Sequence, residues 1–171
     1  MENQTSNLQK AVVYGLLLSL VTILHSLLTA TMGISGVVGI LLWIVKFGAV
    51  IYLLYYLMKK RSLEFEVYTY GDSFRFGILV CVFSTIACAA YSILQFTVIF
   101  PDTVSGQLEQ AMAMMEQSGG DTSALESIDM GKIMRGVIFF GMPIYYMIWG
   151  LILSAILASS TKRNNIYTHE D

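Results

Sequence analysis

The sequence predicts an all-α protein: an integral membrane four-helix bundle with an extracytoplasmic amphipathic helical segment. Of its 171 residues, 56% are hydrophobic, and the mean hydropathy is +0.65. Only 13% are charged, against roughly 25% in soluble domains, which is too little to cover a water-exposed surface. Four runs also exceed the length of about 18 apolar residues that a bilayer-spanning helix needs. This composition excludes a cytosolic enzyme, a disordered chain and a nucleic-acid-binding protein, and the net charge of −2 supports none of them.

The four spans are expected at about residues 11–31, 37–57, 76–99 and 136–158. Backbone groups in hydrocarbon must be paired within the segment, and no run alternates as a barrel strand does, so each is expected to be a helix. The first run is too long for a secretory signal and lacks a good cleavage site. The helices are expected to form a single membrane domain that comprises residues 1–171.

Two connections join the first three spans. The turn at residues 32–36 is so short that the first two helices must be antiparallel neighbours. In the second connection, residues 62–73, Asp72 is expected to cap the third helix with Arg75 as its partner. Four other residues there are apolar or aromatic and are expected at the lipid headgroup boundary: Phe65, Val67, Tyr68 and Tyr70.

The connection between the third and fourth spans, residues 100–135, is strongly acidic. After Pro101, apolar residues recur at the spacing of one helix face and predict an amphipathic helix outside the membrane. Ser123 and Glu126 then form a capping box for a helix that leads into the fourth span. The apolar face consists of Val104, Leu108, Ala111, Met112 and Met115, and the acidic residues are Asp102, Glu109, Glu116, Asp121, Glu126 and Asp129.

The positions of Lys and Arg predict the orientation, because cytoplasmic loops retain these residues. Most lie on one side of the predicted membrane, so both termini are expected in the cytoplasm. The cluster Lys59, Lys60 and Arg61 follows three tyrosines and is expected to contact anionic lipid headgroups. That side holds Lys10, Lys59, Lys60, Arg61, Arg75, Lys162 and Arg163, and the other side holds Lys132 and Arg135.

Small residues form two seams that allow another helix to approach closely. One lies on the third span and consists of Gly77, Cys81, Ser84 and Cys88; the other lies on the fourth and consists of Gly150, Ser154 and Ala158. The seams are expected to pack within one molecule, although contact with a second copy is the alternative. Pro143 beside Gly141 predicts a kink in the fourth span.

Lys46 is the one charged residue inside a span, about 15 Å from the turn and close to the middle of the bilayer. His25 reaches nearly the same depth on the neighbouring helix. A functional interpretation makes the pair part of a proton, anion or headgroup site. The structural interpretation is a polar niche of Ser, Thr and carbonyl oxygens around Lys46. Three aromatic residues of the fourth span either line the same cavity or fill the core: Tyr145, Tyr146 and Trp149.

A resemblance accompanies these features. The entry to the third helix, Tyr70-Gly71-Asp72-Ser73-Phe74-Arg75-Phe76-Gly77, and the Phe100-Pro101-Asp102 sequence after it resemble a family of bacterial integral membrane proteins. It is catalogued as domain of unknown function four-one-nine-nine. The resemblance implies four spans and a bacterial inner-membrane location. It implies no activity, cofactor or catalytic residue.

These observations favour a non-enzymatic accessory or interaction component that uses the acidic segment to contact a protein partner. The alternative is a small transporter or channel that uses Lys46 and His25 and requires assembly into a homo-oligomer. No cofactor or metal is expected, because His25 and His169 are the only histidines. Cys81 and Cys88 lie about 10.5 Å apart along one helix, too far for a disulfide, and are expected to be reduced.

Overall fold

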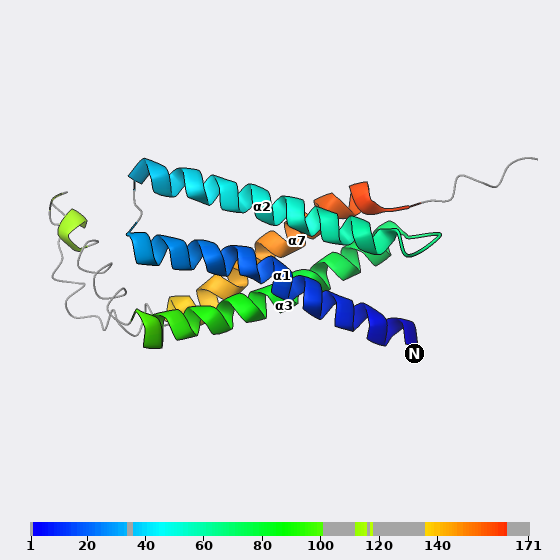
Figure 1. Ribbon diagram of the computed structural model, residues 1–171, viewed down its shortest axis with the longest axis horizontal. Coiled ribbons are helices and arrows are strands. Elements are labelled where there is room, and N and C mark those ends of the chain that lie inside the picture. Colours follow the sequence, from blue (N-terminus) through cyan, green and yellow to red (C-terminus); the bar gives the residue numbers. More distant parts are fainter. Residues whose placement is uncertain (1, 34–35, 101–111, 116, 118–135, 164–171) are drawn as a thin grey trace, which may run out of the picture. The chain divides into compact units, whose positions relative to one another are not determined.

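The computed structural model describes residues 2–33, 36–100, 112–115, 117 and 136–163 (Figure 1). The fold is all-α, as predicted, and the described residues include no strand. The α-helices are α1 (Glu2–Met32), α2 (Gly36–Ser62), α3 (Tyr70–Leu94) and α7 (Met142–Thr161), and two π-helical turns are η1 (Gln95–Ile99) and η2 (Val137–Gly141).

Four helical segments are long and apolar enough to cross a membrane, which confirms the four predicted spans. All four of these helices extend beyond the predicted apolar runs, and the fourth ends at Thr161. The first begins at Glu2, the second continues to Ser62, and the third begins at Tyr70. The apolar run measures only the hydrocarbon crossing, whereas polar flanking residues continue the helical hydrogen bonds outside it.

The chain divides into two compact units: Met1–Cys88 with Tyr146–Asp171, and Ala89–Tyr145. In the second unit, η2 ends at Gly141, two residues before Pro143, where the sequence predicted a kink. Residues 112–115 are helical, as expected for the end of the amphipathic helix, and Met114 and Met115 are exposed. The rest of that predicted helix, and the capping box of Ser123 and Glu126, lie outside the described residues.

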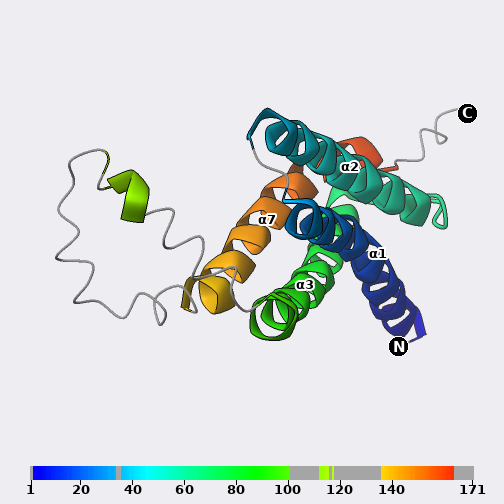
Figure 2. The same cartoon turned by 60° about the vertical axis from the view of Figure 1, so that its left-hand side comes forward.

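In the first unit, α1 lies between α2 and α3 (Figure 2) and crosses α3 at Gly15. A Cβ atom on Gly15 would lie 2.6 Å from Phe83 Cβ and 2.8 Å from the Val80 carbonyl oxygen. Real Cβ atoms do not approach other atoms so closely, so the crossing requires glycine at this position.

The two small-residue seams meet each other, which confirms that they pack within one molecule. A Cβ atom on Gly150 of α7 would lie 2.7 Å from Cys81 Cβ of α3, and one on Gly77 would lie 2.9 Å from Ser154 Oγ. Cys81 Sγ and Ser154 Oγ are 3.6 Å apart. Because these side chains are small, α3 and α7 can pack with their backbones close together.

The core of the first unit lies where the second half of α2 meets the other helices. All four helices contribute to it, and a ring pair with its centroids 5.9 Å apart, Tyr14 and Phe76, joins α1 to α3 edge to face. By contrast, most of the large side chains on the first half of α2 are exposed, as expected for a surface that faces acyl chains. The buried core residues are Ala11, Tyr14, Leu18, Leu54, Leu57, Met58, Phe76, Val80, Cys81 and Ala158.

Candidate functional site

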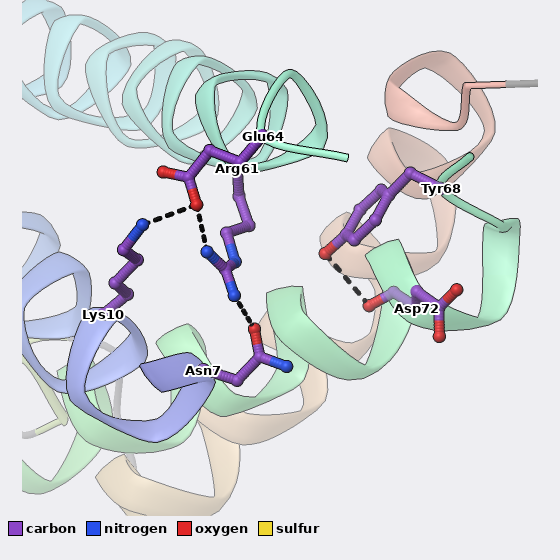
Figure 3. Close-up of polar contacts among 6 residues, drawn as sticks. All are labelled: Asn7, Lys10, Arg61, Glu64, Tyr68 and Asp72. Carbon is purple, nitrogen blue, oxygen red and sulfur yellow. Dashed lines mark hydrogen bonds and ion pairs between the residues drawn. The ribbon is translucent and has the colours of Figure 1, made fainter. Parts of the chain in front are cut away.

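Arg61, in the last turn of α2, is the centre of a polar cluster with Asn7, Lys10 and Glu64 (Figure 3), which we call the Arg61 network. Arg61 is only 3% exposed. Its Nη1 donates a hydrogen bond to the Glu64 carboxylate, and its Nη2 donates one to Asn7 Oδ1. Lys10 Nζ lies 2.5 Å from the same Glu64 oxygen. The network therefore joins α1 to the end of α2.

Two aromatic rings flank the Arg61 guanidinium. Its carbon lies 4.6 Å from the centroid of Phe65 and 5.8 Å from that of Phe76, distances at which the π-faces attract a cation. Phe76 belongs to α3, so Arg61 of α2 contacts both α1 and α3. Among the described residues, Arg61 Nε has no hydrogen-bond partner although it is buried.

The prediction that Arg61 contacts lipid headgroups is wrong. Arg61 lies on the same face of α2 as Leu54, Leu57 and Met58. These three residues are buried, so the Arg61 side chain also points into the protein. Lys60 is exposed and Lys59 is partly exposed. For these two residues, contact with anionic headgroups stays a prediction.

The connection between α2 and α3 is attached to the end of α7. Tyr68 and Arg163 exchange two backbone hydrogen bonds of 2.8 and 2.7 Å. Tyr68 is 5% exposed, and its burial raises the pKa of the hydroxyl to about 12. That hydroxyl donates to the Asp72 carbonyl oxygen at 3.3 Å (Figure 3). The predicted position at the headgroup boundary is therefore wrong for Tyr68, whereas Val67 and Tyr70 are exposed.

The N-cap of α3 is Thr69 and not Asp72, which corrects the sequence prediction. The Thr69 N–H donates to Asp72 Oδ2 at 3.3 Å, and the Asp72 N–H donates to Thr69 Oγ1 at 3.2 Å. This reciprocal pattern is a capping box with an acidic residue three positions after the cap. Asp72 and the exposed Arg75 form no ion pair in the described part of the chain.

His25 lies on α1 and Lys46 on α2, and the two side chains are close enough that positive charges on both would repel each other. His25 Nε2 is buried and has no hydrogen-bond partner among the described residues. Lys46 is partly buried, and the thiol of Cys88 on α3 lies within electrostatic range of it. Cys88 is hydrogen-bonded to Thr22 and Ser84. The structure thus brings the predicted pair together, and its role stays a prediction.

Two hydroxyl groups on α1 near His25 are hydrogen-bonded within α1 itself. Ser19 Oγ donates to the Leu16 carbonyl oxygen at 2.8 Å, and Thr29 Oγ1 donates to the His25 carbonyl oxygen at 2.9 Å. Such bonds to the preceding helical turn satisfy hydroxyl groups in hydrocarbon. These two hydroxyls therefore already have acceptors on their own helix.

The three aromatic residues that were expected either to line a cavity or to fill the core differ in their positions. Trp149 of α7 packs edge to face on Phe47 of α2, with the ring centroids 5.5 Å apart, and Phe47 stacks on Trp43 at 5.6 Å. Phe47 is the neighbour of Lys46 in sequence. Tyr146 is partly buried, and the exposed Tyr145 belongs to the second unit. A shared cavity with His25 and Lys46 stays a prediction.

Within the described ranges, no three His, Cys, Asp or Glu side chains are grouped as metal ligands. Cys81 and Cys88 are both buried, free cysteines. Sequence reasoning missed the Arg61 network, because two of its bonds, between Asn7 and Arg61 and between Lys10 and Glu64, join residues 54 positions apart. The one available signal was the helical spacing from Leu54 to Arg61.

Comparison with known proteins identifies a family but no individual relative. The family described as "Protein of unknown function (DUF4199)" matches residues 10–163. No curated protein and no solved structure matches the chain. The match includes the apolar part of every candidate membrane span and the whole connection between α3 and α7. The chain therefore belongs to the DUF4199 family of proteins of unknown function.

Proposed function

We propose that this membrane protein is a non-enzymatic accessory or interaction component of the bacterial inner membrane. In this proposal the helices of the first unit anchor the chain, and the acidic segment 100–135 contacts a protein partner. The observation that supports the proposal is the Arg61 network. Its charged groups bond to one another and join α1 to the end of α2, which indicates a structural role for them and not a catalytic one. The acidic segment contains six carboxylates, more than any other connection in the sequence, and these are the charges that the proposal assigns to a partner.

The proposal places both termini in the cytoplasm and the acidic segment on the opposite side. The distribution of Lys and Arg supports this orientation. In it, Lys59 and Lys60 lie at the cytoplasmic surface beside anionic headgroups.

A pair of topology reporters tests this orientation. A reporter fused after Asp171 is expected on the cytoplasmic side, and one inserted between Ser118 and Gly119 is expected on the opposite side. Measurement uses a phosphatase that is active outside the cytoplasm and a fluorescent protein that folds inside it. Equal sidedness at the two positions would contradict the arrangement of four spans.

A second candidate function is a small oligomeric transporter or channel. It is favoured by the interaction between His25 and Lys46, because ionisable residues inside membrane spans commonly mark ion or substrate pathways. Four helices rarely enclose such a pathway alone, so this candidate requires assembly of several copies.

Complementation of a deletion strain distinguishes the two functions. One variant replaces the six acidic residues of segment 100–135 with Asn or Gln, and the other is Lys46→Met. An interaction component is expected to lose function in the first variant and keep it in the second, whereas a transporter should show the reverse. Membrane levels of both variants are measured by immunoblotting. Full complementation by both variants would contradict both functions.

A further inference from the structure

We propose that His25 and Lys46 bind a singly charged anion between α1 and α2. The inference rests on the site of the second candidate function, but it requires neither transport nor assembly. It names the class of ligand and can be tested on the purified protein alone.

The balance of charges supports an anion. Lys46 carries three donors and no acceptor, and protonated His25 would add a second positive charge. None of the four predicted spans contains Asp or Glu. Among the described residues, the only ion pairs are those of Glu64 with Lys10 and Arg61, at the far end of α2 from its turn with α1. Protonated Lys46 is thus a cation in hydrocarbon for which the described residues supply no counter-ion.

The polar groups nearest to the pair are well placed to support a ligand. His25 Nε2 is buried and lacks a hydrogen-bond partner in the described ranges, so it can donate a bond to an anion when protonated. Cys88 contributes a polar sulfur from α3 and is itself held by Thr22 and Ser84. Three helices therefore supply groups around Lys46.

The depth of the site limits the charge of its ligand. The desolvation cost of an ion rises with the square of its charge, so a dianion such as phosphate is strongly disfavoured in the middle of a bilayer. A singly charged anion would instead neutralise Lys46 and reduce the cost of its burial.

Two sources could supply such an anion. An inorganic anion such as chloride or nitrate would enter from water. A long-chain fatty acid would enter from the lipid, because the residues beside the pair, Trp43, Val45 and Leu24, are exposed along the surface expected to face acyl chains. The acid would arrive protonated and transfer its proton to His25, which leaves a carboxylate next to Lys46.

The experiment measures anion binding to the full chain in nanodiscs of phosphatidylcholine. His169→Gln leaves His25 as the single histidine, so the ring resonances of His25 in an NMR spectrum report on the site. One arm titrates chloride and nitrate, and the other titrates oleate. We expect a saturable shift of the His25 resonances in at least one arm, and that arm identifies the source.

Matched lysine variants in the same background test the role of Lys46. Lys46→Met is expected to weaken binding at least about tenfold, the loss of one charge-assisted hydrogen bond. Lys46→Arg should retain binding, and Lys162→Met, which removes an exposed lysine at the end of α7, should leave it unchanged.

The inference is overturned if the His25 resonances do not saturate with any of the three anions. It is also overturned if the dissociation constant is the same in Lys46→Met and Lys162→Met. If Lys46→Met does not fold, the titration is repeated with Lys46→Arg, which keeps the positive charge. A folded Lys46→Arg variant whose His25 resonances do not shift during the titration contradicts binding. Since no partner or transport is measured, these results are independent of the complementation experiment.

Discussion

Replacing Glu64 with Gln is expected to lower the free energy of unfolding by about 2 kcal/mol at pH 7. The change removes the counter-charge of Arg61, which is almost completely buried, and two charge-assisted hydrogen bonds, from Arg61 and Lys10. Removing one partner of a fully buried pair costs about 3–5 kcal/mol. Glu64 itself is one third exposed, so solvent screening reduces that value. Unfolding by denaturant in mixed micelles gives the measurement.

Glu66→Gln is the matched control, because Glu66 is an exposed glutamate two residues further along the same connection. Its replacement is expected to change the free energy of unfolding by no more than about 0.5 kcal/mol. Equal effects of the two substitutions would show that the Arg61 network does not stabilise the fold.

The difference between the wild type and Glu64→Gln should depend on pH in a defined direction. Burial raises the pKa of the Glu64 carboxyl, but the hydrogen bonds from Lys10 and Arg61 and their charges outweigh this, so the pKa lies below its ordinary value. A lowered pKa in the folded state stabilises the fold at pH values above the unfolded pKa, about 4.3. The difference should therefore be constant near pH 7 and decline as the pH falls through the folded pKa. A difference that grows on acidification would contradict this assignment.

The spans of the bundle could be predicted from sequence because hydrocarbon imposes a minimum length on apolar runs. The ends could not, since Glu2 and Ser62 lie in polar stretches where nothing in the apolar pattern marks a helix terminus. The start of α3, unlike the other helix ends, could have been predicted from the sequence. Thr69 and Asp72 have the spacing of a capping box, and this local signal was available in the sequence.

The candidate sites were predictable to different extents. Their distance from the short turn places His25 and Lys46 at similar depths on adjacent helices, and the structure has the two side chains within electrostatic range of each other. The composition of the Arg61 network was not predictable, because Asn7 meets Arg61 and Lys10 meets Glu64 only through the packing of α1 against the end of α2. In a run of three basic residues on a helix, the residue that faces inward can be identified only when the buried face of the helix is known.

Replacing Gly15 with Ala is expected to destabilise the protein by about 3 kcal/mol or more. The added methyl group would lie 2.8 Å from the Val80 carbonyl oxygen and 2.9 Å from the Ser84 nitrogen. These are backbone atoms of α3, so no side-chain rotation relieves the contact, and α1 and α3 must move apart. Overpacking typically costs about 1–3 kcal/mol and more where the backbone has to shift. Separation would also loosen the core residues beside Gly15, which include Tyr14 and Leu18.

Gly48→Ala is the matched control: it makes the same glycine-to-alanine change, but it is not expected to destabilise the protein. No atom lies within 4 Å of a Cβ atom at Gly48, which is exposed on α2. Alanine is favoured over glycine in a helix by about 0.5–1 kcal/mol, so this variant is expected to be neutral or slightly more stable.

Thermal unfolding of both variants in the same detergent gives the comparison. If Gly15→Ala unfolds at or above the wild-type temperature, then α1 and α3 do not cross at Gly15. Destabilisation of both variants alike would mean that the loss comes from replacing glycine in a helix and not from contact between helices.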